Sequence, residues 1–108
     1  MVFVVAASRT YDTGSGPLTV EFSTPQEVDG LISCAYRFRD SAGQHREETT
    51  FFGVDSVQAL IFCLTGAGDY LQRFEPTASF AGLPFTGLLA TDLTADSMWS
   101  ATVRLPVG

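Results

Sequence analysis

The chain has 108 residues, and its composition excludes several classes of protein before any motif is considered. With 45% hydrophobic and 17% charged residues it is neither disordered nor fibrous, and its length fits one globular domain over residues 1–108. All six basic residues are arginines, against twelve acidic residues, so the net charge is −6. Surplus negative charge repels phosphate backbones and anionic lipids, so we expect neither nucleic-acid binding nor membrane binding.

The apolar start of the chain and its two cysteines bear on the cellular compartment. The first apolar run ends at Ala7 with no preceding basic residue, unlike a secretory signal, and the run over residues 59–64 is too short to span a membrane. Cys34 and Cys63 are too few for a disulfide framework and too far apart for a CxxC motif. These features predict a cytoplasmic protein with reduced thiols.

Period-two alternation in the first half predicts four strands in two hairpins, over residues 2–10, 18–23, 31–39 and 45–52. Residues 24–30 connect the hairpins, and we expect them to break the strand pairing. In the third strand the inward-facing side chains are predicted to be Ile32, Cys34, Tyr36 and Phe38. The outward Arg37 and Arg39 would then face the acidic residues of the fourth strand, in cross-strand pairs that favour this register by about 0.2–1 kcal/mol each.

After the fourth strand the hydrophobic period changes from two to 3.6. Asp55 and Gln58 have the spacing of an N-cap residue and its capping box, which predicts a helix over residues 56–73. Its core-facing stripe is predicted from the apolar residues at helical spacing, namely Val57, Leu60, Ile61, Leu64, Gly68 and Leu71. Gly66 and Gly68 each cost about 1 kcal/mol inside a helix, so a kink or an early end near the middle is an alternative.

The helix cannot continue past Pro76. Residues 77–97 are too apolar for a free linker and are predicted to form an ordered loop with a short strand. Alternation over residues 98–105, with Trp99 facing inward, predicts a last strand. Strand runs followed by one helix and a returning strand predict an α+β fold, with a mostly antiparallel sheet of about five strands and one main helix packed on one face.

The segment Gly-Val-Asp-Ser-Val-Gln-Ala-Leu at residues 53–60, continued by Leu64 and Gly66-Ala67, resembles the signature of a family of short bacterial proteins that is catalogued as a domain of unknown function. The resemblance covers residues 1–74 and includes two N-terminal hairpins that lead into this helix. It supports the predicted fold and implies no activity, ligand or cofactor.

Candidate reactive residues are few. His45, Glu47 and Glu48 cluster in sequence, but alternation puts Glu48 on the opposite strand face from the other two, so we interpret them as a solvated strand and not as a metal or acid–base site. Cys34 and Cys63 fall among apolar side chains and are interpreted as core residues, not as nucleophiles. We therefore predict no catalytic, metal-binding or cofactor-binding residues.

A second apolar face on the helix is the most informative feature. At about 100° per residue, a set of small and aromatic side chains falls together on the side away from the predicted core stripe. These predicted partner-binding residues are Ala59, Phe62, Gly66 and Tyr70. Two occupants of this face remain open, the chain's own tail over residues 80–89 and a second subunit.

Two functions of different classes are consistent with these patterns. The first is a small acidic, non-enzymatic interaction protein of adaptor or immunity type, either as a homodimer or with a basic protein partner, acting through the Phe62 and Tyr70 face or a strand edge. The second is a small-molecule-binding or catalytic domain with a pocket between helix and sheet. That pocket would be lined by Tyr36, Phe38, Phe51 and Trp99. The acidic composition favours the first.

Overall fold

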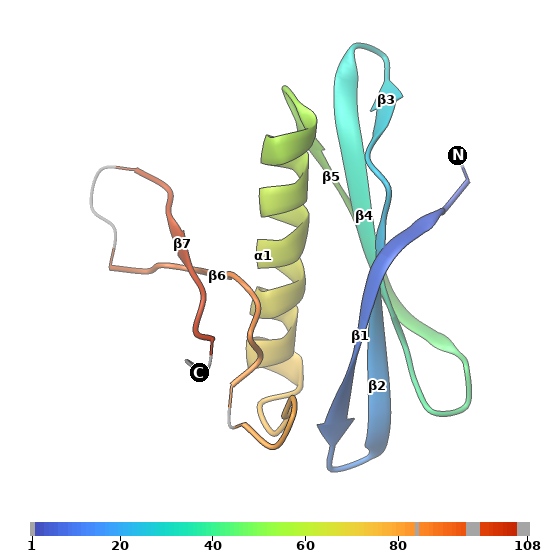
Figure 1. Cartoon of the computed structure of the whole chain (residues 1–108), viewed down its shortest axis with the longest axis vertical. Coiled ribbons are helices and arrows are strands. Elements are labelled where there is room, and N and C mark those ends of the chain that lie inside the picture. Colours follow the sequence, from blue (N-terminus) through green and yellow to red (C-terminus); the bar gives the residue numbers. More distant parts are fainter. Residues whose placement is uncertain (1, 84, 95–97, 106–108) are drawn as a thin grey trace.

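The computed structural model describes residues 2–83, 85–94 and 98–105 and arranges them in three layers (Figure 1). The elements, in chain order, are β1 (Val5–Thr13), β2 (Gly16–Ser23), β3 (Gln26–Val28), β4 (Leu31–Arg39), β5 (His45–Gly53), α1 (Ser56–Phe74), β6 (Ala90–Thr91) and β7 (Ala101–Thr102). Strands β1 to β5 form one antiparallel sheet, α1 packs on one of its faces, and the segment with β6 and β7 lies beyond the helix. The predicted α+β class, with about five strands and one main helix, is confirmed.

The sheet contains a strand that the sequence analysis missed. β2 and β3 lie on the same side of β4, β2 against its second half and β3 against its first, while β5 pairs along the other side. The prediction that residues 24–30 break the pairing is therefore wrong for β3. Asp29 and Gly30 have φ angles of 52° and 83°, as in the type I′ turn of a tight hairpin. An Asp-Gly pair between short strands is the sequence signal for this hairpin.

The face of α1 that meets the sheet differs from the predicted stripe. Its fully buried positions recur every four residues, at Ala59, Cys63, Ala67 and Leu71. Val57 and Ile61, predicted to be core, are exposed. The predicted stripe is confirmed for Gly68 and Leu71, which are buried, and Leu60 and Leu64 are partly buried against the core. It is wrong for Val57 and Ile61, because the buried side of the helix is rotated away from them.

Packing against aromatic rings explains this rotation. The sheet presents its bulkiest side chains to the helix, namely Tyr36, Phe38 and Phe51. Protein interiors are close-packed, so over most of the interface these bulky rings face small helix side chains, while Tyr70 and Leu71 fill the space near the end of the helix. The large aliphatic residues dominate the hydrophobic pattern of the helix, but the small ones make much of its contact with the sheet.

Close packing also explains why the helix runs through its two glycines without a break. A Cβ atom at Gly66 would clash with the ring of Phe51 on the sheet, and one at Gly68 would clash with the carbonyl oxygen of Leu89 on the opposite side. The alternative of a kink or an early end is therefore wrong. Each glycine lets a neighbouring layer approach the helix backbone, which compensates for its low helix propensity.

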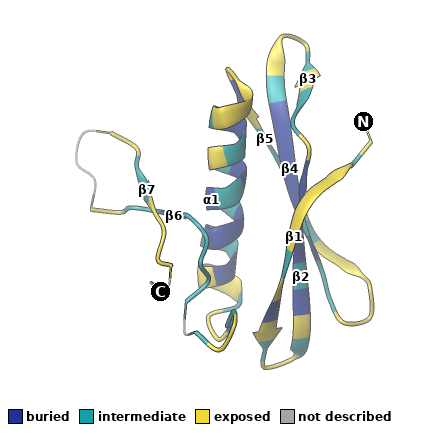
Figure 2. Cartoon of the chain, in the orientation of Figure 1, coloured by how far each residue is buried: buried dark blue, intermediate teal, exposed yellow. Residues whose placement is uncertain are grey.

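The chain leaves the sheet at Ser79, whose backbone N–H and C=O both pair with Asp12 on the edge strand β1, at 2.9 Å each. Residues 80–105, called here the C-terminal segment, then cross to the far side of α1. The predicted last strand over residues 98–105 is reduced to β7, which pairs with β6 and not with the main sheet. The segment contacts the edge strand β1 through side chains, but among the described strands β6 and β7 pair only with each other, and Figure 2 shows that much of the segment is exposed.

In the part of the chain that the structure describes, no helix is both long and apolar enough to cross a lipid bilayer.

Candidate functional site: an apolar groove at the start of the helix

α1 begins with the cap that the sequence predicts. The Asp55 carboxylate accepts a hydrogen bond from the backbone N–H of Gln58 at 2.8 Å, and the Gln58 side-chain oxygen accepts one from the backbone N–H of Val54 at 2.8 Å. These polar groups therefore bond to the chain itself and fix the first turn of the helix. Several apolar side chains around the cap are exposed.

Four of these apolar side chains face solvent. Their exposed fractions are 75% for Val54, 62% for Val57, 37% for Ile61 and 51% for Trp99. Together with Phe62 they line an open groove of about 620 Å³, which also has Asp55 and Gln58 in its lining. We call this surface the N-terminal groove. A contiguous apolar surface on a small protein commonly marks an interaction site.

The groove is assembled from two distant parts of the chain. Trp99 comes from the C-terminal segment, which is anchored to the helix where Asp69 accepts hydrogen bonds from the backbone N–H and the hydroxyl of Thr91, at 2.9 and 2.7 Å. The rings of Trp99 and Phe62 then meet edge to face, with centroids 5.2 Å apart and planes at 79°. The docked segment therefore supplies one wall and the helix the other.

The four residues predicted to bind a partner are separated by the fold. Ala59 is fully buried under the sheet, Gly66 faces the ring of Phe51, and Tyr70 stacks on Phe38 with ring centroids 4.7 Å apart. Phe62 alone belongs to the N-terminal groove. The expectation of a single second face is corrected accordingly, because the side of the helix assigned to a partner faces the sheet.

The residues that do line the groove were missed for a related reason. Val57 and Ile61 were assigned to the core because large aliphatic side chains at helical spacing usually face it. The available signal was the presence of small residues on the opposite side of the same helix, which makes either face a candidate for the sheet. For Trp99 no sequence signal indicates a position beside the helix, because its contact with Phe62 depends on how the C-terminal segment docks.

Among the described residues that line the groove, Asp55 is the only charged one, and none is basic. Between Arg46 and Arg73 the chain has no arginine, and its charged residues there are Glu47, Glu48, Asp55 and Asp69. Arg46 itself is bound to Glu75 at 2.9 Å. Nothing basic in the helix therefore offsets the Asp55 carboxylate beside the groove before Arg73 near the helix end.

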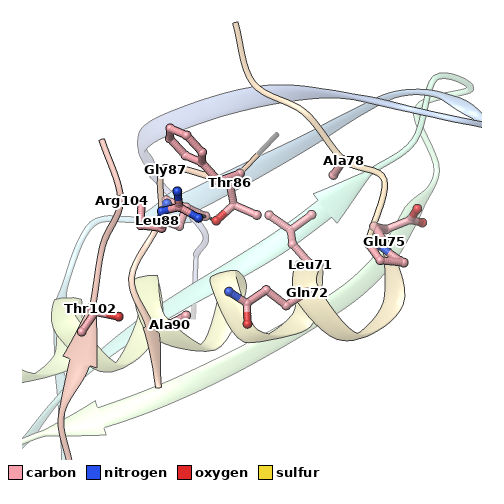
Figure 3. A pocket seen from close by; sticks show the side chains of 12 residues that line it. Leu71, Gln72, Glu75, Ala78, Thr86, Gly87, Leu88, Ala90, Thr102 and Arg104 are labelled. Carbon is pink, nitrogen blue, oxygen red and sulfur yellow. Dashed lines mark hydrogen bonds between the residues drawn. The ribbon is translucent and has the colours of Figure 1, made fainter. Parts of the chain in front are cut away.

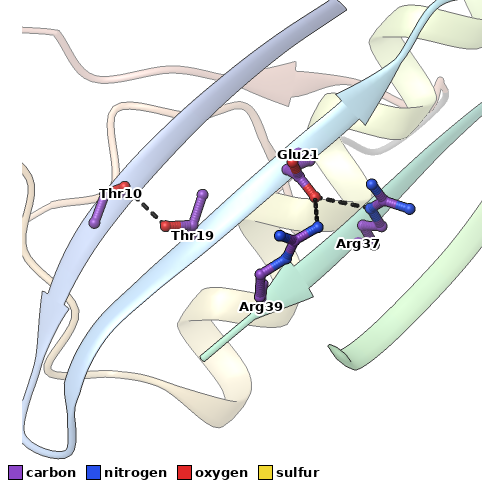
Figure 4. A network of polar contacts seen from close by, with 5 residues as sticks. All are labelled: Thr10, Thr19, Glu21, Arg37 and Arg39. Carbon is purple, nitrogen blue, oxygen red and sulfur yellow. Dashed lines mark hydrogen bonds and ion pairs between the residues drawn. The ribbon is translucent and has the colours of Figure 1, made fainter. Parts of the chain in front are cut away.

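On the outer face of the sheet Arg37 lies opposite Glu48 of β5 in the strand register, as predicted, but the ion pairs of Arg37 and Arg39 are formed with a different strand. The guanidinium groups of Arg37 and Arg39 both donate to one carboxylate oxygen of Glu21, at 2.8 and 3.0 Å (Figure 4). Beside it, the hydroxyls of Thr10 and Thr19 share a hydrogen bond of 2.8 Å between β1 and β2. The arginines thus join β4 to β2, not to β5, and the network stabilises the sheet and has no evident catalytic use.

The histidine–carboxylate cluster stays at the surface, as predicted. His45 is exposed at the start of β5, and Glu47 accepts a hydrogen bond from the hydroxyl of Thr49 at 3.1 Å. Over residues 2–83, 85–94 and 98–105, no three histidine, cysteine or acidic side chains converge in a way that could hold a metal ion.

The two cysteines meet across the interface of sheet and helix and are 1% and 0% exposed, which confirms that both are core residues. A hydrogen bond from Cys63 lowers the pKa of the Cys34 thiol to about 7, and the same bond together with burial raises the pKa of Cys63. A nucleophile must also reach its substrate. Burial denies Cys34 that access, so the pair contributes packing and not chemistry at the surface.

The space in which the alternative pocket was expected is filled by aromatic rings. Tyr36 packs against Phe38 and Phe51 with ring centroids 5.5 and 6.0 Å apart, and Tyr70 closes the cluster from the helix. Trp99, the fourth predicted lining residue, lies beside Phe62 and takes no part in this cluster.

Comparison with known proteins gives one match. The family model of a domain of unknown function, DUF6968, matches residues 7–79, which confirms the resemblance noted in the sequence and covers most of β1, the strands β2 to β5 and the whole helix. No curated protein matches the chain, and no solved structure does.

Proposed function

The chain belongs to the DUF6968 family, a domain of unknown function, and we propose that it is a non-enzymatic interaction protein whose N-terminal groove takes up a basic segment of another protein. The single observation behind this proposal is the groove itself, whose apolar lining is exposed to solvent. The polar groups of the helix cap beside it already bond to one another and do not require a ligand. An apolar groove beside a helix suits an amphipathic helix, which inserts side chains spaced three and four residues apart.

Charge identifies the class of partner. The groove has Asp55 and no arginine in its described lining, and the whole chain carries a net charge of −6. Complementary charge speeds encounter and selects the partner, while apolar contact supplies most of the affinity. The proposed partner is therefore a helix with leucine-like residues on one face and lysine or arginine on the flanks, in an adaptor- or immunity-type pairing.

A second copy of the chain fits less well. It would bring a second Asp55 and a second net charge of −6 to the interface, and like charges across an interface disfavour association. The same charge balance disfavours nucleic acid as the partner. Two free thiols fit a protein that works in the reducing cytoplasm.

The test uses Trp99, the sole tryptophan of the chain, as a reporter inside the groove. The probe is a peptide of leucine and lysine with leucines at helical spacing, and its control replaces every lysine by glutamate. We expect the lysine peptide to shift the Trp99 emission to the blue in a saturable manner and the glutamate peptide to leave it unchanged. Binding should weaken as salt is added, because exposed charges are screened.

Matched variants distinguish binding in the groove from non-specific electrostatic attraction between the lysine peptide and the acidic chain. Val57→Ser combined with Ile61→Ser removes apolar side chains without changing charge, and should weaken the lysine peptide by roughly tenfold or more. Leu93→Ser removes a side chain that is 91% exposed and lies outside the groove, and should have no effect. Equal weakening by both would overturn the proposal. So would a concentration-dependent dimer in light scattering that the double variant dissociates, since the groove would then belong to a second copy.

A further inference from the structure

A second concave site lies at the other end of the helix. A cavity of about 270 Å³ is enclosed by the last turn of α1, the turn at residues 76–78, and the C-terminal segment at residues 85–90 and 102–104. In Figure 3 the helix supplies Leu71 and Gln72, with Glu75 and Ala78 at one end of the cavity and Arg104 at the other. Its apolar floor includes Leu71 and Ala78, which are 0% and 6% exposed.

The walls of this cavity are held in place by partly buried hydrogen bonds. On one side the hydroxyl of Tyr11 donates to the carbonyl of Thr86 at 2.6 Å, and the Arg9 guanidinium donates to the carbonyls of Thr86 and Gly87 at 3.3 and 2.9 Å. On the other side Thr91 is fixed by two hydrogen bonds to Asp69. The cavity is thus formed before any ligand arrives, which lowers the entropy cost of binding.

The charges that line the cavity favour an anion. Glu75 is its acidic residue, and Arg46 binds that carboxylate from outside at 2.9 Å. Arg104 is exposed, with its guanidinium carbon 5.0 Å from the centre of the Phe85 ring, and among the described residues no carboxylate forms an ion pair with it. An arginine fork beside an aromatic ring suits a planar carboxylate attached to an apolar group.

Size restricts the ligand further. Sites for drug-sized molecules generally measure about 300–1,000 Å³, so this cavity suits a molecule below that range. From these observations we propose that the cavity binds a small aryl or alkyl carboxylate, with its carboxylate on Arg104 and its apolar part over Leu71 and Ala78. The site shares no residue with the N-terminal groove, so this inference is independent of the proposed function.

The experiment is a titration of the full chain, labelled with nitrogen-15, by phenylacetate, with amide chemical shifts as the readout. We expect saturable shifts that cluster at residues 71–78, 85–90 and 102–104. The neutral analogue phenylacetamide has the same shape and should bind roughly ten- to a hundredfold more weakly, as expected when a charge-assisted hydrogen bond is lost. Arg104→Gln should weaken phenylacetate by a similar factor.

Arg73→Gln is the matched control, because Arg73 is another exposed arginine beside an aromatic ring but lies outside the cavity. It should leave phenylacetate binding unchanged. Equal weakening by both variants, equal affinity for phenylacetate and phenylacetamide, scattered shifts, or no saturable shift at tens of millimolar would each overturn the proposal. The Arg104→Gln variant should still bind the leucine–lysine peptide. A failed prediction for the cavity can therefore be distinguished from a failed prediction for the N-terminal groove.

Discussion

The sheet–helix body, residues 5–79, and the C-terminal segment, residues 80–105, are stabilised in different ways. The body depends on continuous strand pairing and a core in which Tyr11, Val20 and Phe38 are fully buried. The segment has two strands of two residues each and is attached by hydrogen bonds with the side chains of Arg9, Tyr11 and Asp69 and by the packing of Phe80 and Leu88 against the core. The body therefore holds most of the strand pairing and of the buried core, whereas the C-terminal segment depends on the body for its position.

The limits of the family match fit this division. The DUF6968 model ends at Ser79, which is also the residue that makes the final pairing with the sheet, on β1. Both candidate binding sites, however, take residues from the C-terminal segment: Trp99 in the groove, and Phe85 and Arg104 in the cavity. The family fold therefore supplies a platform, and the segment completes the surfaces that we propose to bind ligands.

Removal of a large side chain should change the free energy of unfolding far more in the core of the body than in the C-terminal segment. Phe38→Ala leaves a cavity beside Tyr36 and Tyr70 and should lower the free energy of unfolding by about 3–5 kcal/mol. Leu93→Ala, at 91% exposure, should change it by less than about 0.5 kcal/mol. Urea unfolding followed by circular dichroism measures both. A loss below about 1 kcal/mol for Phe38→Ala would contradict the assigned core.

Two glycines on opposite sides of α1 allow each region to be disturbed separately. Gly66→Ala pushes against Phe51 and should destabilise the whole fold by about 1–3 kcal/mol, as overpacking does. Gly68→Ala instead pushes against the backbone of Leu89 and should detach the C-terminal segment while the body stays folded. Trp99 emission should then shift to the red in Gly68→Ala with the far-ultraviolet spectrum unchanged. Identical behaviour of the two variants would contradict the layered arrangement.

Alkaline pH should lower the free energy of unfolding by a smaller amount, because buried tyrosines ionise. Burial is the main cause that raises the pKa of Tyr11, Tyr36 and Tyr70 above their ordinary 10.0. The folded state therefore favours neutral phenols, and this contribution to stability is complete below pH 10 and is lost as pH rises through the raised values. The chain contains no lysine to obscure the titration.

The measurement is tyrosinate absorbance recorded together with circular dichroism. Ionisation of the tyrosines should coincide with unfolding. Tyr11→Phe should make the free energy of unfolding depend less on pH, and should itself lower that free energy by about 1 kcal/mol because the hydrogen bond to Thr86 is lost. Ionisation of all three phenols at their ordinary pKa, with the fold intact, would contradict the burial described here.

Prediction from the sequence succeeded where the pattern depends on neighbours along the chain. Alternation gave the long strands, and Asp55 with Gln58 gave the start of the helix. It failed where three-dimensional packing decides, because side-chain size relative to the aromatic sheet, and not hydrophobicity, sets which helix face is buried. The groove could not be predicted from the sequence for the same reason, since Trp99 approaches Phe62 only after the whole C-terminal segment has docked.

The contacts of Tyr11 and Arg9 also have a consequence for the order of folding. They join residues 75 to 78 positions apart in the chain, whereas the long strand pairings of the body form hairpins or join strands close in sequence. Local contacts form quickly and long-range closure comes later. During synthesis both hairpins can pair before residues 86 and 87 have emerged from the ribosome. Docking of the C-terminal segment is then the last step, in which a hydroxyl and a guanidinium on β1 exchange water for the carbonyls of Thr86 and Gly87.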